Sequence, residues 1–217
     1  MNPFRSFIRL NKDRERLSKI TKPKGVSIIM SKTISVRSVF AGLLAVTMFF
    51  AAFPFSVAKA EKAPSPADLN DLEIAHVAYT ADSIDISYAK LALSKSKNPV
   101  VIDFAETMIR DHTAVNDQAL ALLKKLNAQP QDNFLSKQLN EQADKLVKEM
   151  SGLSGAAFDK RYAENELAYH QSVNALVGET FIPNIENPEM KQLFEQALVI
   201  FKNHEQHAQK MVDSLKQ

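Results

Sequence analysis

The sequence predicts an all-α fold, a four-helix bundle with a short additional connecting helix. Apolar residues recur at spacings of three and four over long stretches, and no stretch alternates with the period of two that a half-buried strand requires. Glycine is scarce, at five of 217 residues. Several expected helix starts pair a serine or asparagine with a following proline, which is typical of helix N-termini. Long amphipathic helices of this kind bury their apolar faces against one another.

Capping residues predict the boundaries of the helices. Three pairs combine an N-cap residue with proline at the first helical position: Ser65-Pro66, Asn98-Pro99 and Asn187-Pro188. Asp132 or Asn133 can cap a shorter segment, and Ser154 can cap the helix that follows it. We therefore expect four long helices, near 66–96, 99–127, 156–181 and 188–215, with the connecting helix at about 134–150.

The first 60 residues have the pattern of an export signal. Lys32 and Arg37 precede an apolar run over 39–57, and Ala58-Lys59-Ala60 follows it as a small-x-small cleavage site. We therefore expect export to the periplasm and no stable membrane span after cleavage. An uncleaved signal that anchors the protein in the inner membrane is the alternative, because 19 residues are just enough to cross a bilayer.

Three segments follow from this pattern. Met30 begins the signal cleanly, so 1–29 is an upstream extension or a misassigned start, 30–60 is the signal peptide and 61–217 is the mature helical domain. The whole chain has a formal net charge of +2, but 61–217 contain 16 Lys/Arg and 23 Asp/Glu, a net charge of −7. Such a surface repels phosphate backbones, so we expect no nucleic-acid partner. The absence of cysteine excludes disulfides, thiolate metal sites and thiol catalysis.

Three histidines lie in the middle of apolar stripes, each on a different expected helix. Steps of four and three along the last helix give Met190, Phe194, Ala197, Phe201, His204, Ala208, Met211 and Leu215. His112 and His170 take equivalent positions in the helices near 99–127 and 156–181. All three are about 20–24 Å from the start of their helices, at similar height. A buried imidazole requires a hydrogen-bond partner or a metal, because leaving it unpaired costs roughly 1–3 kcal/mol.

Two acidic residues accompany these histidines. Glu166 lies one turn before His170 on the same face, and Asp85 lies on the flank of the first helix at a height from which it can approach His112. We therefore expect a metal site formed by the following residues: His112, His170, His204, Glu166 and Asp85. Imidazole and carboxylate ligands suit zinc, copper, nickel or iron.

The same residues can instead form a metal-free hydrogen-bond network that fixes the register of the helices. His170 would then pair with Glu166, His112 with Asp85 or Asp111, and His204 with a core tyrosine. The protein would then be a structural or stress-related interaction protein. No catalytic residue is assigned, because the sequence has no Gly-x-Ser-x-Gly motif and no phosphate-binding glycine loop. Enzymatic use of a bound metal is a third hypothesis.

Two further histidines are expected to be solvated, because His76 and His207 fall outside the apolar stripes. His76 ends the one Glu-x-x-His motif of the sequence, Glu73-Ile-Ala-His76. A dinuclear iron site of the ferroxidase type needs two such motifs, so we do not expect one here.

Several short motifs resemble a known bacterial family. They are Asn98-Pro99-Val100, Phe104-Ala105, Met108, Asp111-His112-Thr113, Asn116, Ser154-Gly155, Phe158-Asp159, Tyr162, His170, His204 and Ala208. Over about 71–212 the chain resembles the ferritin-like family catalogued as domain of unknown function four-one-four-two (DUF4142), whose members are often labelled exported or outer-membrane proteins.

The resemblance implies a ferritin-like four-helix bundle in the bacterial envelope, with no established activity. It also implies that the family's histidine positions correspond to His112, His170 and His204. The family pattern has a glutamate where this chain has Asp85. An aspartate is one methylene shorter and reaches less far, which weakens the assignment of Asp85 as a metal ligand.

Overall fold

The computed structural model describes residues 63–216. The expected signal peptide at 30–60 and the segment 1–29 lie outside these residues. Within them the structure is all-helical, with no strand. The long helices are α2 (Asp71–Lys95), α3 (Pro99–Lys125), α4 (Phe134–Ser151), α5 (Gly155–Leu176) and α7 (Pro188–Ser214). Three short elements complete the order: the 3-10 helix η1 (Pro66–Asp68), the π-helix η2 (Val177–Phe181) and α6 (Ile182–Asn184).

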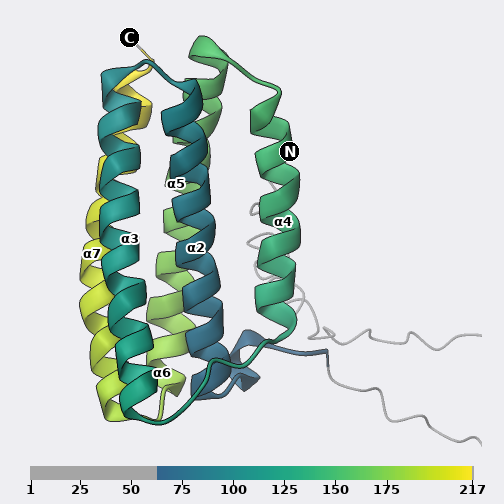
Figure 1. Ribbon diagram of the computed structural model, residues 1–217, viewed down its shortest axis with the longest axis vertical. Coiled ribbons are helices and arrows are strands. Elements are labelled where there is room, and N and C mark those ends of the chain that lie inside the picture. The colour runs from purple at the N-terminus through teal and green to yellow at the C-terminus, as the bar shows by residue number, and fades with distance from the viewer. Residues whose placement is uncertain (1–62, 217) are drawn as a thin grey trace, which may run out of the picture.

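Successive long helices run in opposite directions, and four of them enclose the core (Figure 1). Helix α2 packs against α3, α3 against α7, α7 against α5, and α5 back against α2. Helix α4 lies outside this circuit, mainly along α2. The loop that leads into α4 is tied to the start of α2, because Asn133 Nδ2 donates a hydrogen bond of 3.0 Å to the carbonyl oxygen of Glu73. No helix among residues 63–216 is long and apolar enough to span a membrane.

Asparagines cap the helices. Asn98 and Asn187 each precede a proline at the first helical position, and their side chains accept hydrogen bonds from the first turns of α3 and α7. Asn133 caps α4 in the same way. Ser154 stands at the N-cap of α5 but makes no side-chain cap bond. The expected starts of these four helices are therefore confirmed to within a residue.

The start of the first helix differs from the expectation. Ser65 caps only the three residues of η1, and α2 begins at Asp71 instead of 66. The reason is a stronger capping arrangement five residues later. The Asn70 side chain accepts from the backbone of Glu73, and the Glu73 carboxylate accepts from the backbone N–H of Asn70 at 3.0 Å.

The end of the helix expected at 156–181 also differs. Helix α5 ends at Leu176, and the chain continues as the π-helix η2. Gly178 lies in this wider turn, where η2 approaches α7 closely: a Cβ atom at Gly178 would be 3.3 Å from Leu198 Cδ2. Only a residue without a side chain fits this approach without displacing Leu198.

Candidate metal centre

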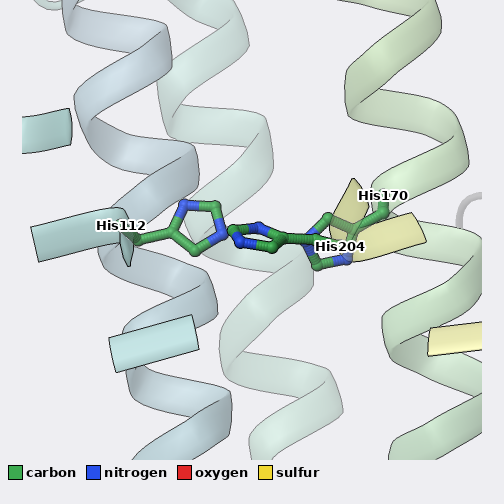
Figure 2. Close-up of side chains that lie close together, drawn as sticks. All are labelled: His112, His170 and His204. Atoms are coloured by element: carbon green, nitrogen blue, oxygen red, sulfur yellow. The ribbon is translucent and has the colours of Figure 1, made fainter. Parts of the chain in front are cut away.

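Three histidines from three helices meet in the core (Figure 2). His112 lies on α3, His170 on α5 and His204 on α7, and none is more than 3% exposed. Their ring centroids are 5.1–5.8 Å apart. One ring nitrogen from each lies within 4.8 Å of the other two. The structure therefore brings together the three histidines that the helical periodicity singles out.

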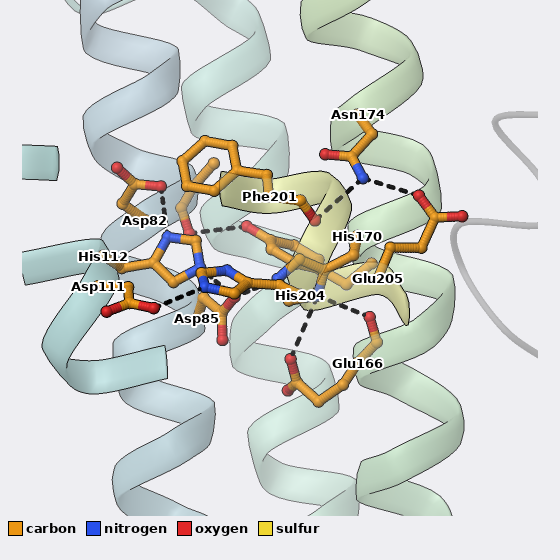
Figure 3. Close-up of polar contacts among 12 residues, drawn as sticks. Asp82, Asp85, Asp111, His112, Glu166, His170, Asn174, Phe201, His204 and Glu205 are labelled. Carbon is orange, nitrogen blue, oxygen red and sulfur yellow. Dashed lines mark hydrogen bonds and ion pairs between the residues drawn. The ribbon is translucent and has the colours of Figure 1, made fainter. Parts of the chain in front are cut away.

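Each imidazole uses its outer nitrogen to contact an oxygen acceptor. The three contacts are His112 Nδ1 to Asp82 Oδ1 at 2.7 Å, His170 Nδ1 to the backbone carbonyl of Glu166 at 2.9 Å, and His204 Nε2 to Asp111 Oδ2 at 2.9 Å. Because a carbonyl or carboxylate oxygen accepts, the facing ring nitrogen carries the proton and donates. These contacts therefore fix the orientation of each ring (Figure 3).

The inner nitrogens are the ones that the three rings turn toward one another. Among residues 63–216, His112 Nε2, His170 Nε2 and His204 Nδ1 are buried and make no hydrogen bond of good geometry. Metal-binding histidines have this same arrangement, with one nitrogen donating to a carboxylate or carbonyl and the other left as a ligand. The inner nitrogens of His170 and His204 can therefore donate to one cation, and that of His112 can join them once it has lost its proton.

Asp85 on α2 reaches this centre in spite of its short side chain. It is fully buried, and its Oδ2 atom lies 2.9 Å from His112 Nε2 and 3.3 Å from His170 Nε2. Both are ion-pair contacts that lie off the line of a good hydrogen bond. Asp85 can make both contacts because α2 packs directly against α3.

Glu166 lies one turn before His170 on α5, near the Nδ1 atom of that ring. It is fully buried, its Oε2 atom is 3.9 Å from His170 Nδ1, and neither carboxylate oxygen makes a hydrogen bond within the described part of the chain. One ligand atom each from Glu166, Asp85 and His170 lie within 4.8 Å of one another. All five residues of the expected site therefore converge, as two groups that share His170.

Burial and the local charges set the protonation of the centre. Burial opposes a charge on His112, but the carboxylates of Asp85 and Asp82 outweigh it and raise the pKa of His112 to about 10. Burial likewise opposes a charge on Asp85, yet His112 and His170 lower the pKa of Asp85 to about 2. At neutral pH the His112–Asp85 contact is therefore a buried ion pair.

The other two histidines of the centre are neutral at neutral pH. Burial lowers the pKa of His170 below its usual value, and burial lowers the pKa of His204 to about 4. Burial, with the adjacent charge of Asp85, raises the pKa of Glu166 well above its usual range. His170 and His204 therefore present free imidazole lone pairs, which is the form that binds a metal.

One expected pairing is wrong, because His204 contacts Asp111 and not a core tyrosine. Of the two partners expected for His112, the structure confirms Asp85, and it adds Asp82 on the other side of the ring. The rotation of α3 explains why Asp111 pairs with His204: it sits one residue before His112 and so faces α7. The pairing of His170 with Glu166 is confirmed, although the hydrogen bond goes to the backbone carbonyl.

Two further residues, Asp82 and Phe201, contact His112 at the centre, although no such role was predicted for them. Asp82 lies three positions before Asp85, on the same face of α2, and that spacing is the signal that identifies it. Phe201 lies one turn before His204 on α7, and its ring stacks on His112 with a centroid distance of 4.9 Å and an interplanar angle of 15°.

The two histidines expected to be solvated lie outside the centre but are half-buried. His207 Nε2 is 3.4 Å from Asp103 Oδ2, and its ring contacts Phe104 edge-on. His76 Nδ1 is 4.0 Å from Asp132 Oδ1, near the start of α2. Neither belongs to a group of ligand atoms close enough to hold a metal among the described residues.

Comparison with known proteins gives one family. Neither a curated protein nor a solved structure matches the chain. A family model described as Domain of unknown function (DUF4142) matches residues 56–211, which include every residue of the centre. The match covers well over half of the 217 residues. The chain therefore belongs to the DUF4142 family.

Proposed function

We propose that this protein is an exported ferritin-like four-helix bundle that binds one transition-metal ion in its core. The ligands are His112, His170 and His204, and Asp85 and Glu166 act as carboxylate ligands or as neighbours that orient the imidazoles. The observation that carries the proposal is the orientation of the rings. Three outer nitrogens are held by oxygen acceptors, and the three inner nitrogens are buried and make no hydrogen bond of good geometry among residues 63–216, while one ring nitrogen of each histidine lies within 4.8 Å of the others.

The donor set suits zinc, copper, nickel or iron. Three imidazole nitrogens with one or two carboxylates form a mixed nitrogen and oxygen site, which these ions accept. The hard ions magnesium and calcium prefer oxygen ligands alone. Export is supported by the apolar run over 39–57 with its basic flank and its small-x-small site. In the periplasm such a protein would bind or store a metal, or use it in a reaction that the site leaves open.

A metal-free structural role is the second candidate, and one observation favours it. His112 lies between two buried carboxylates, Asp82 at 2.7 Å and Asp85 at 2.9 Å, and so is already paired as a cation. Such a network can fix the register of α2 against α3 without any ligand. The protein would then act through other proteins of the envelope.

Elemental analysis of the purified protein tests the proposal. The protein is exported in cells and isolated without chelators or a histidine tag, and its metal content is compared with that of the His204→Ala and His207→Ala variants. The proposal expects near-stoichiometric metal that is lost from His204→Ala and retained by His207→Ala, because His207 lies outside the centre. Absence of metal, together with no thermal stabilisation by zinc, copper, nickel or iron, would support the structural role instead.

A further inference from the structure

Two small, partly open cavities lie side by side between the helices, lined by both buried and half-buried residues. The first has a volume of about 40 Å³ and lies between α2, α4, α5 and η2. The second has a volume of about 30 Å³ and lies between α2, α3, α5 and α7. They share a wall of four small or branched apolar residues: Ala78, Ala81, Val173 and Val177. A shift of one of these side chains would join the two cavities.

The second cavity ends at the histidine cluster. Asp82 and Phe201 both line it, and both contact His112, through the 2.7 Å hydrogen bond of Asp82 and through the stacked ring of Phe201. The Phe201 ring also lies 6.0 Å from that of His204. Phe201 lies against His112 and near His204 (Figure 3), and it also lines the second cavity, so it stands between that cavity and these two imidazoles.

Size and lining restrict what these cavities can hold. Most of the walls are aliphatic or aromatic, so an ion or a strongly polar molecule would lose hydration without gaining partners. Apolar walls of this kind favour small apolar molecules over ions and polar solutes. Because a single water needs about 10–15 Å³ on the same measure, each cavity has room for a molecule of only a few atoms.

We propose that the two cavities form a path by which a neutral diatomic molecule, of the size of dioxygen or nitric oxide, reaches the histidine cluster. The molecule enters from the side of α4, crosses the shared wall at Val173, and meets the imidazoles when the Phe201 ring swings aside. This inference rests on the proposed function in one respect, since the molecule's target is the metal held by the histidines.

Dissolved dioxygen is the probe, because it is paramagnetic and enhances nuclear relaxation where it enters. The metal-free full-length protein is studied by NMR under dioxygen pressure, with nitrogen pressure as the reference. The path predicts strong enhancement at the Val173 and Val177 methyls and at the His112 ring protons. Weak enhancement at these sites, equal to that of the closely packed Ala105, would overturn the inference.

Two variants test the path itself. Val173→Phe fills the shared wall and should remove the enhancement at His112, while Val199→Phe adds the same ring at an exposed site on α7 and should leave it unchanged. If Val173→Phe does not fold, Ala81→Leu fills the same wall. Enhancement at His112 that survives the filled wall would overturn the path.

Two measurements, the metal content and the relaxation enhancement, distinguish a failure of this inference from a failure of the proposed function. Metal content is measured on the same preparations, and the relaxation measurement needs no metal. If the protein contains metal but dioxygen causes no enhancement at His112, the proposed path is wrong and the proposed metal site stands. Dioxygen entry without metal keeps the cavities as gas sites but removes their target, and therefore overturns both the inference and the proposed function.

Discussion

Asp85 and His112 form a buried ion pair between α2 and α3, with 2.9 Å between Oδ2 and Nε2. The pKa values of both partners favour the charged forms, about 2 for Asp85 and about 10 for His112. The contribution of Asp85 to stability is therefore complete above its unfolded value of 3.8 and is lost as the pH falls through about 2. That of His112 is complete below 6.5 and is lost as the pH rises through about 10.

Removing one partner should destabilise the protein strongly. Asp85→Asn leaves the charge of His112 with Asp82 alone, and breaking a buried pair in this way costs roughly 3–5 kcal/mol. We expect the free energy of unfolding of the metal-free protein to fall by about this amount at pH 6.5, measured with urea. Asp213→Asn, at the exposed end of α7, should cause no measurable change. Equal effects of the two substitutions would contradict the ion pair.

Acid should destabilise the metal-free protein through His204. Its pKa is lowered from 6.5 to about 4 by burial, so the unfolded chain binds a proton there before the folded one does. Stability should therefore fall as the pH decreases from 6.5 to 4, by about 3 kcal/mol when the titration is complete. His204→Gln should flatten this part of the stability curve, and His207→Gln should preserve it. A curve of unchanged slope in His204→Gln would show that other groups carry the acid sensitivity.

Metal binding should release protons. With a pKa of about 10, His112 is protonated at neutral pH and must lose its Nε2 proton before that nitrogen can bind a metal. The affinity for zinc should therefore rise by about tenfold per pH unit between pH 6 and 8 for each proton released. Isothermal titration calorimetry in buffers of different ionisation enthalpy measures the number of protons. Binding that is independent of pH would exclude His112 as a ligand.

Asp82 should act as a positioning residue for the metal. It contacts His112 Nδ1 on the side away from the other imidazoles, so its effect reaches the metal only through the ring. Asp82→Asn should weaken metal affinity by about 10–100-fold, the usual effect of losing such an orienting partner, and shift the His112 ring resonances. Asp103→Asn provides the matched control, because Asp103 contacts His207 outside the centre. An affinity equal to that of the control would remove Asp82 from the site.

Helical periodicity is sufficient to find the residues that point inward. It identified His112, His170 and His204, and the all-helical fold, because a stripe of apolar residues marks the buried face whatever the neighbouring helix is. It could not assign partners: whether Asp111 faces α2 or α7 depends on the rotation of α3, which no single stripe fixes. The ferritin-like bundle and the metal remain proposals.

Capping signals in the sequence predicted the helix ends less accurately than periodicity predicted the buried faces. Ser65-Pro66 and Asn70 with Glu73 both begin a helix, and the sequence offers no way to see that the first supports only one turn. The π-helix at Val177–Phe181 has no side-chain signature of its own. Gly178 within it lies close to Leu198 of α7, a contact between helices that the local sequence does not reveal.

The histidine cluster draws its contacts from α2, α3, α5 and α7, so its residues span the chain from Asp82 to His204. A folding intermediate that lacks any one of these helices has an incomplete cluster. The complete cluster therefore exists only once all four helices have packed together. A ligand that binds only the complete cluster would slow the unfolding reaction and leave the rate of folding almost unchanged, so its presence would extend the lifetime of the native state in the cell without helping the chain to reach it.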